Sequence, residues 1–186
     1  MTNIWGYKVI AQILSTYNPS PKKVLEIGCG HGGFVGVLCK AGFDTYGLDK
    51  YKTGFGASGT HRFNDRLILA DAQNIPFKNQ FNAVVSNSLL STVGLETIAG
   101  FDGSGYLILD SGGELEKPNK GKPEVVARNI HKSVHDVLTE GGIAIHIVPH
   151  NETVIAPPKN LYESKEVTLT IDDGAKQNVG SVLRKI

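Results

Sequence analysis

The chain has few of the residues that mark secreted, disulfide-bonded or membrane-spanning proteins. Its 186 residues include only two cysteines, Cys29 and Cys39, and two thiols do not make the cross-linked framework of a small secreted domain. No apolar run approaches the roughly 20 residues that a membrane span needs. The first residues also lack a charged region followed by an apolar one. We therefore expect a cytoplasmic protein without a membrane partner.

The chain also lacks an excess of positive or negative charge. Nineteen lysines and arginines against eighteen acidic residues give a formal charge of +1, which leaves no overall field to attract a nucleic acid. A small group of lysines at 117–122 is offset by glutamates between 114 and 124. We expect no nucleic-acid partner, and the oligomeric state is left open.

Apolar residues recur at two spacings along the chain, which predicts its organisation. The length and the 40% hydrophobic content indicate one domain, residues 1–186. Helical spacing predicts helices at 2–17, 34–41 and 123–139. Short apolar runs predict five strands, at 24–27, 45–48, 67–70, 81–86 and 143–148.

This alternation of strands and helices predicts an α/β fold. Its centre would be a mostly parallel twisted sheet with helices on both faces. Runs at 167–171 and 179–186 add a C-terminal antiparallel β-hairpin. Two segments interrupt the pattern. Three glycines make 50–65 a loop in place of a helix, and 101–122 is an insertion with one strand at 106–109.

Glycine is in excess, at 22 of 186 residues against a usual share of ~7%, and it is concentrated at the first strand-to-helix turn. This turn reads Glu26-Ile27-Gly28-Cys29-Gly30-His31-Gly32. Its glycines let the backbone approach a ligand, and free N–H groups point outward. With Gly33 the turn also satisfies G-x-G-x-x-G, and Asp49 follows about 20 residues later, as in nicotinamide-dependent oxidoreductases.

Three acidic residues favour a different ligand. Glu26 places a carboxylate at the end of the first strand, where it suits a cationic amine better than a pyrophosphate. Asp49 is placed for a ribose diol, and Asp71 with Ala72 could read the edge of an adenine. Together these groups describe a nucleoside joined to an amino acid with no phosphate between them. That ligand is S-adenosylmethionine.

These motifs resemble those of the class I S-adenosylmethionine-dependent methyltransferases, in particular their small-molecule, methyltransferase type 11-like branch. The resemblance covers about two thirds of the chain and implies a Rossmann-like sheet. The segments that carry it are 24–32, 47–49, 70–77, 81–86 and 138–142.

The resemblance also implies roles for individual residues. The glycine turn would line the methionine moiety, Asp49 would bond the ribose hydroxyls, and Asp71 with Ala72 would hold the adenine. Asn87, after the fourth strand, would face the sulfonium. The complete implied set is Glu26, Gly28, Cys29, Gly30, Gly32, Asp49, Lys50, Asp71, Ala72 and Asn87.

The expected reaction is methyl transfer to a small-molecule acceptor by in-line displacement, with no metal. The fourth strand ends Ser86-Asn87-Ser88-Leu89, unlike the Asn/Asp-Pro-Pro-Tyr of enzymes that methylate exocyclic amines of DNA bases. His150, after the fifth strand, is the candidate general base, with His31 behind it. His131 and His135 lie four apart on a helix, but without a third ligand we interpret them as solvated or capping residues.

Two alternatives remain open at this point. The literal G-x-G-x-x-G is compatible with a nicotinamide-dependent oxidoreductase. A non-catalytic S-adenosylmethionine-binding subunit is the other alternative, because the chain is short and shows no unmistakable catalytic residue.

Overall fold

The computed structural model describes residues 4–17, 23–51, 65–87, 89, 98–101, 107–109, 123–147, 157–170 and 176–186. The helices in these ranges are α1 (Ile4–Tyr17), α2 (Gly33–Lys40) and α4 (Pro123–Val137). The strands are β1 (Lys23–Ile27), β2 (Asp44–Asp49), β3 (Leu67–Leu69), β4 (Phe81–Asn87), β5 (Ile98–Phe101), β6 (Leu107–Leu109), β7 (Leu138–Ile147), β8 (Tyr162–Thr170) and β9 (Lys176–Lys185).

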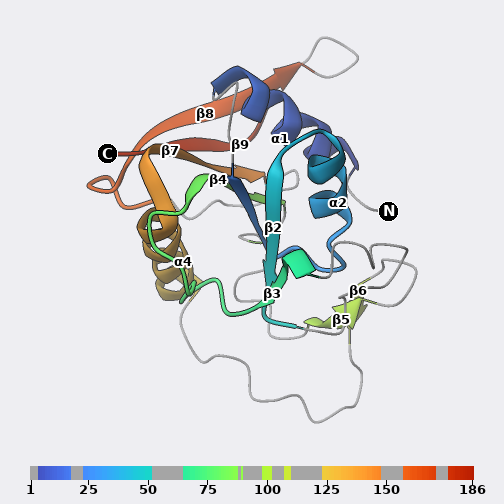
Figure 1. Ribbon diagram of the computed structural model, residues 1–186. Coiled ribbons are helices and arrows are strands. Elements are labelled where there is room, and N and C mark those ends of the chain that lie inside the picture. Colours follow the sequence, from blue (N-terminus) through green and yellow to red (C-terminus); the bar gives the residue numbers. More distant parts are fainter. Residues whose placement is uncertain are drawn as a thin grey trace.

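Seven of the strands form one sheet in the order β3-β2-β1-β4-β7-β9-β8 (Figure 1). The pairs from β3 through to β7 are all parallel. These five strands are the five that short apolar runs predicted. The predicted mostly parallel α/β sheet is therefore confirmed.

The C-terminal hairpin is also confirmed, with longer strands than predicted. Its second strand, β9, pairs antiparallel with β7 on one side and with β8 on the other. The last strand of the chain, β9, therefore lies between β7 and β8, and β8 forms the edge of the sheet.

Helices cover both faces of the sheet (Figure 1). On one face, Ile10 and Leu14 of α1 and Phe34 of α2 pack with Val24 of β1 and Val85 of β4. On the other face, Ile130 and Val134 of α4 pack with Leu25, Ile27 and Val84 of the same strands. Because neighbouring strand residues point to opposite faces, strands buried on both sides need the continuous apolar runs that the sequence shows.

Two details differ from the prediction. The last helix ends at Val137 instead of residue 139, and β7 begins at once with the fully buried Leu138. The register between β4 and β7 then shifts between Phe81 and Ala83, so Gly141, with φ 69°, lies in an irregular part of a strand and does not end a helix. The predicted strand at 106–109 is β6, which pairs with the unpredicted β5 in a separate antiparallel sheet.

Candidate functional site

The candidate site lies where the carboxyl ends of β2, β1 and β4 meet. From β1 the chain builds the sheet outward through β2 and β3, and then returns to add β4 on the other side of β1. Such a switch point is where ligands bind in open α/β sheets. Glu26, Asp49 and Asn87 all lie within the last two residues of these strands, so the sheet brings the three predicted residues to one edge.

The glycine turn after β1 has the backbone that glycine allows. Gly28, Gly30 and Gly32 have φ values of 73°, 50° and 73°, in the left-handed region that disfavours other residues. The N–H groups of Gly28 and Cys29 both donate to the carbonyl of Leu48, at 2.7 and 3.2 Å. The turn is therefore fixed against the end of β2.

The glycines of this region serve two different purposes. A Cβ at Gly47 of β2 would lie 2.8 Å from both Cys29 Sγ and Val35 Cγ2, so this glycine lets β2 pack against the turn. A Cβ at Gly30 would meet no described heavy atom within 4 Å. The space beside Gly30 is therefore clear of the described residues. Gly47 was not among the predicted site residues, although a glycine inside a predicted strand is a signal of close approach.

Glu26 is a buried carboxylate beneath the turn, with only 2% of its surface exposed. The backbone N–H of Val35, in the first turn of α2, donates to it. Its Oε2 has no hydrogen-bond partner among the described residues. Burial, and then the negative charge of Asp49, hold the pKa of Glu26 well above its usual range. A cation bound at this turn would pair with the carboxylate and offset both effects.

Asp49 joins the turn to the end of β2. Its Oδ2 accepts from the N–H of Gly30 at 2.9 Å, and its Oδ1 accepts from the N–H of Tyr51 at 3.0 Å. A carboxylate offers about four acceptor positions, so the half-buried Asp49 keeps capacity for a diol. Lys50 is exposed, and its Nζ lies 4.9 Å from the centre of the Tyr51 ring.

Asp71 follows β3 and is brought beside β2 because the N–H of Ala70 donates to the carbonyl of Asp49 at 3.0 Å. Its Oδ1 accepts from the backbone N–H of Gln73 at 2.8 Å, and its Oδ2 accepts from Gln73 Nε2 at 3.3 Å. Ala72 is buried. The structure therefore holds Asp71 in a fixed orientation at the same edge as Asp49.

Behind Asn87, a buried polar pair joins β4 to β7. Ser86 Oγ lies 2.8 Å from His146 Nδ1. Burial, and then the neighbouring His131, lower the pKa of His146 to about 3, so this ring is neutral at ordinary pH. The interpretation of His131 as solvated or capping is wrong: it is 1% exposed, and its ring centre lies 5.3 Å from that of His146. The sequence could not show that His131 is buried, because its neighbour His146 belongs to β7 and not to the same helix.

Residues 25–115 match the family model of a methyltransferase domain. This segment is therefore similar to a methyltransferase domain, and the solved structures that share its fold include methyltransferases with S-adenosylmethionine or S-adenosylhomocysteine bound. This match, together with the fold, confirms the resemblance in the sequence motifs, the enzyme class and the cofactor. The nicotinamide interpretation of the glycine turn receives no support from the match.

Solved methyltransferase structures share the fold of this domain. The 1,6-didemethyltoxoflavin-N1-methyltransferase of Burkholderia thailandensis, solved with 1,6-didemethyltoxoflavin and S-adenosylhomocysteine, superimposes with a TM-score of 0.60 at 11% identity, over 98% of this chain and 81% of that one. The N-methyltransferase NodS of Bradyrhizobium japonicum WM9, in complex with S-adenosylhomocysteine, gives 0.56 at 13% identity, over 96% and 86%.

A third structure is CalS10, an amino pentose methyltransferase from Micromonospora echinaspora with S-adenosylmethionine bound. It gives a TM-score of 0.55 at 14% identity, over 97% of this chain and 75% of that one. At these identities the likeness shows the fold alone. No curated protein matches the methyltransferase significantly in sequence.

Some predicted parts of the methyltransferase lie outside the described residues. These are the candidate base His150, most of the glycine-rich segment at 50–65 and most of the insertion at 101–122. The base and the role of the insertion therefore stay predictions.

Proposed function

We propose that this methyltransferase binds S-adenosylmethionine across the carboxyl ends of β1 and β2 and the segment after β3, and methylates a small-molecule acceptor. The observation that carries the proposal is the buried Glu26, whose Oε2 has no partner among the described residues. This oxygen fits a cofactor that carries an ammonium group, because a buried carboxylate is costly without a partner.

The amino-acid end of the cofactor would lie against the glycine turn. The ammonium group would pair with Glu26. The methionine chain would lie along the backbone of Gly28, Cys29, Gly30 and Gly32. The two carboxyls of Glu26 and Asp49 already repel each other enough to raise the pKa of Glu26. A pyrophosphate placed here would add further negative charge, which disfavours a dinucleotide.

The nucleoside end would extend along the sheet edge from β2 toward the segment after β3. Asp49 would accept hydrogen bonds from the ribose hydroxyls, next to Lys50. Asp71 would accept from the exocyclic amine of adenine, with the backbone of Ala72 beside the ring. Asn87, at the end of β4, would face the sulfonium.

When bound, S-adenosylmethionine supplies a methyl group on a good leaving group, so that the bond from the acceptor to the methyl carbon forms as the carbon–sulfur bond breaks. The contribution of the chain is then to hold the acceptor in line, and alignment supplies much of the rate. A hydroxyl or amine acceptor must also lose a proton, and we propose His150 as the group that takes it.

The proposal of a small acceptor rests on two observations. The chain has almost no net charge to hold a nucleic acid. The toxoflavin and amino pentose enzymes that share its fold act on small molecules. Among the described helices, none is long and apolar enough to cross a membrane. We also propose a cytoplasmic single-domain enzyme with the insertion at 101–122 near the acceptor.

Calorimetric titration with S-adenosylhomocysteine tests the cofactor site. Glu26→Gln and Asp49→Asn should each weaken binding by about 1.5–3 kcal/mol, the range for hydrogen bonds to charged groups. Glu163→Gln, which changes an exposed glutamate of β8, should leave the affinity unchanged. Wild-type affinity in both site variants, or tighter binding of NAD⁺ than of S-adenosylhomocysteine, would contradict the proposal.

A further inference from the structure

The segment between β3 and β4 is held in place by a helix that follows it by about 50 residues. This segment, residues 70–80, contains no helix of its own. The backbone N–H of Ile75 instead donates to Ser133 Oγ of α4 at 2.8 Å, and both residues are buried. A buried N–H must find an acceptor, and here a side chain of α4 provides it.

A second contact from α4 reaches the same segment two residues earlier. Asn129 Nδ2 donates to Gln73 Oε1 at 3.3 Å, and Gln73 Nε2 donates to Asp71 Oδ2 at 3.3 Å. The amide of Gln73 therefore presents its N–H₂ side to the Asp71 carboxylate. The backbone N–H of Gln73 fixes the other carboxylate oxygen at 2.8 Å.

The anchor on the α4 side is rigid. Ile130, Val134 and Val137 of α4 are buried in the core beneath the sheet, on the same helix as Ser133 and Asn129. A displacement of the 71–75 segment would therefore cost either a buried hydrogen bond or core packing.

We propose that Ser133 and Gln73, supported by Asn129, are positioning residues that make the site selective for adenine over a 6-oxopurine. The inference rests on the proposed function, in which Asp71 accepts from the adenine amine. These residues act through Asp71 and Ala72, and none of them needs to touch the cofactor.

The selectivity follows from donors and acceptors. Adenine donates from its exocyclic amine and accepts at N1, which suits the carboxylate of Asp71 and a backbone N–H at Ala72. Hypoxanthine accepts at O6 and donates at N1, so both contacts become unfavourable. A site built to hydrogen-bond one group rejects the analogue that lacks it only while its own groups stay fixed.

The test compares the affinities of S-adenosylhomocysteine and S-inosylhomocysteine by calorimetry. The wild type should prefer the adenine compound by at least about 100-fold. Ser133→Ala removes the acceptor of the Ile75 N–H, and Gln73→Leu removes the side-chain donor to Asp71. Each variant should therefore reduce this preference by about tenfold. Ser133→Thr keeps the hydroxyl and should restore the preference. Arg128→Ala changes an exposed residue next to Asn129 and serves as the control.

Asn129→Asp provides a sharper variant. A carboxylate at position 129 would accept from Gln73 Nε2, which turns the Gln73 carbonyl toward Asp71 and repels it. The preference should then fall further than in Asn129→Ala. A uniform loss of affinity for both compounds, with an unchanged ratio, would show a structural role only and overturn the inference.

Asp71→Asn separates this inference from the proposed function. If Asp71→Asn lowers the preference while Ser133→Ala and Gln73→Leu do not, the positioning role is wrong and the adenine site stands. If Asp71→Asn leaves the preference unchanged, the adenine role of Asp71 is wrong and the inference falls with it. Thermal unfolding of each variant confirms that folded protein is compared.

Discussion

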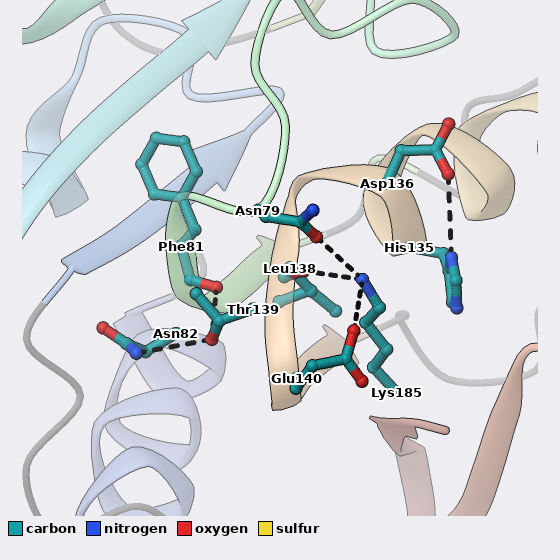
Figure 2. Close-up of polar contacts among 9 residues, drawn as sticks. All are labelled: Asn79, Phe81, Asn82, His135, Asp136, Leu138, Thr139, Glu140 and Lys185. Atoms are coloured by element: carbon teal, nitrogen blue, oxygen red, sulfur yellow. Dashed lines mark hydrogen bonds and ion pairs between the residues drawn. The ribbon is translucent and has the colours of Figure 1, made fainter.

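The two edges of the central sheet treat buried charge in opposite ways. At the amino edge, Lys185, at the end of β9, is 8% exposed, and its ammonium group has three acceptors around it (Figure 2). Its Nζ lies 3.0 Å from Asn79 Oδ1, 2.9 Å from the carbonyl of Leu138 and 3.5 Å from Glu140 Oε1. At the carboxyl edge, the carboxylate of Glu26 is more deeply buried and keeps one oxygen without a partner in the described part of the chain.

Other polar side chains at the amino edge are also hydrogen-bonded within the chain. At the amino edge, Thr139 Oγ1 donates to the carbonyl of Phe81 at 3.3 Å and accepts from Asn82 Nδ2 at 3.4 Å (Figure 2). Asn82 Oδ1 also accepts from the backbone N–H of Lys23. The polar groups around Lys185 and Thr139 are therefore satisfied within the chain, whereas Thr45 Oγ1, near the start of β2, is buried without a partner among the described residues. A buried carboxylate without a partner costs more free energy than a hydroxyl does, so the unpartnered oxygen of Glu26 supports the proposal that a ligand completes the carboxyl edge.

The largest expected effect comes from blocking the carboxyl edge. Gly30→Val places a branched side chain in the open space beside the turn and should weaken S-adenosylhomocysteine binding by at least about 100-fold, or about 2.7 kcal/mol. Gly33→Val is the matched control: Gly33 is exposed, its φ lies outside the positive region, and its added Cβ would also meet no described atom. Calorimetry that finds equal affinities for the two variants would mean that the cofactor does not pass Gly30.

The next effect comes from opening the amino edge. Lys185→Met keeps most of the apolar stem and removes the ammonium group, which leaves the carbonyl of Leu138 without this donor. The free energy of unfolding in urea should fall by about 1–3 kcal/mol. Affinity for S-adenosylhomocysteine should be unchanged, because the two edges lie at opposite ends of the strands. If Lys185→Met lost affinity for S-adenosylhomocysteine and kept its stability, the amino edge would not have the structural role assigned to it.

The sequence predicted the carboxyl edge far better than the amino edge. Glu26 lies next to the end of a short apolar run, and Asp49 and Asn87 each follow one. Strand prediction alone therefore places the three residues at one edge. Lys185 meets Asn79 across 106 positions, and no local pattern indicates such a pair. Ser133 and Ile75 are 58 positions apart, and their contact depends on how α4 lies along the sheet.

Local pattern also failed where strands are short or irregular. The unpredicted β5 has four residues and includes Gly100, which weakens any strand signal. The boundary at Val137 was misplaced because Glu140 and Gly141 read as a helix stop. The pairing of Leu138 with Phe81 instead draws these residues into the sheet, and tertiary pairing outweighs local propensity there.

The smallest expected effect is a change in protonation at Glu26. Burial, and then the charge of Asp49, raise its pKa well above the ordinary value of 4.5 in the free protein, so the folded state binds this proton more tightly than the unfolded chain does. The resulting stability is complete below about pH 4.5 and is lost as the pH rises through the raised pKa. Chemical unfolding of the wild type and of Glu26→Gln across this range should show the fall in the wild type alone.

Cofactor binding should act on the same proton. An ammonium group beside Glu26 favours the charged carboxylate and lowers its pKa, so binding of S-adenosylhomocysteine should release a fraction of a proton, and affinity should rise with pH up to the raised pKa. Calorimetry in two buffers with different ionisation enthalpies measures that release. Glu26→Gln should abolish it, whereas Lys185→Met at the amino edge should not change it. Proton uptake in the wild type, or the same release in Glu26→Gln, would mean that the ammonium group lies elsewhere and that Glu26 stays buried for a structural reason.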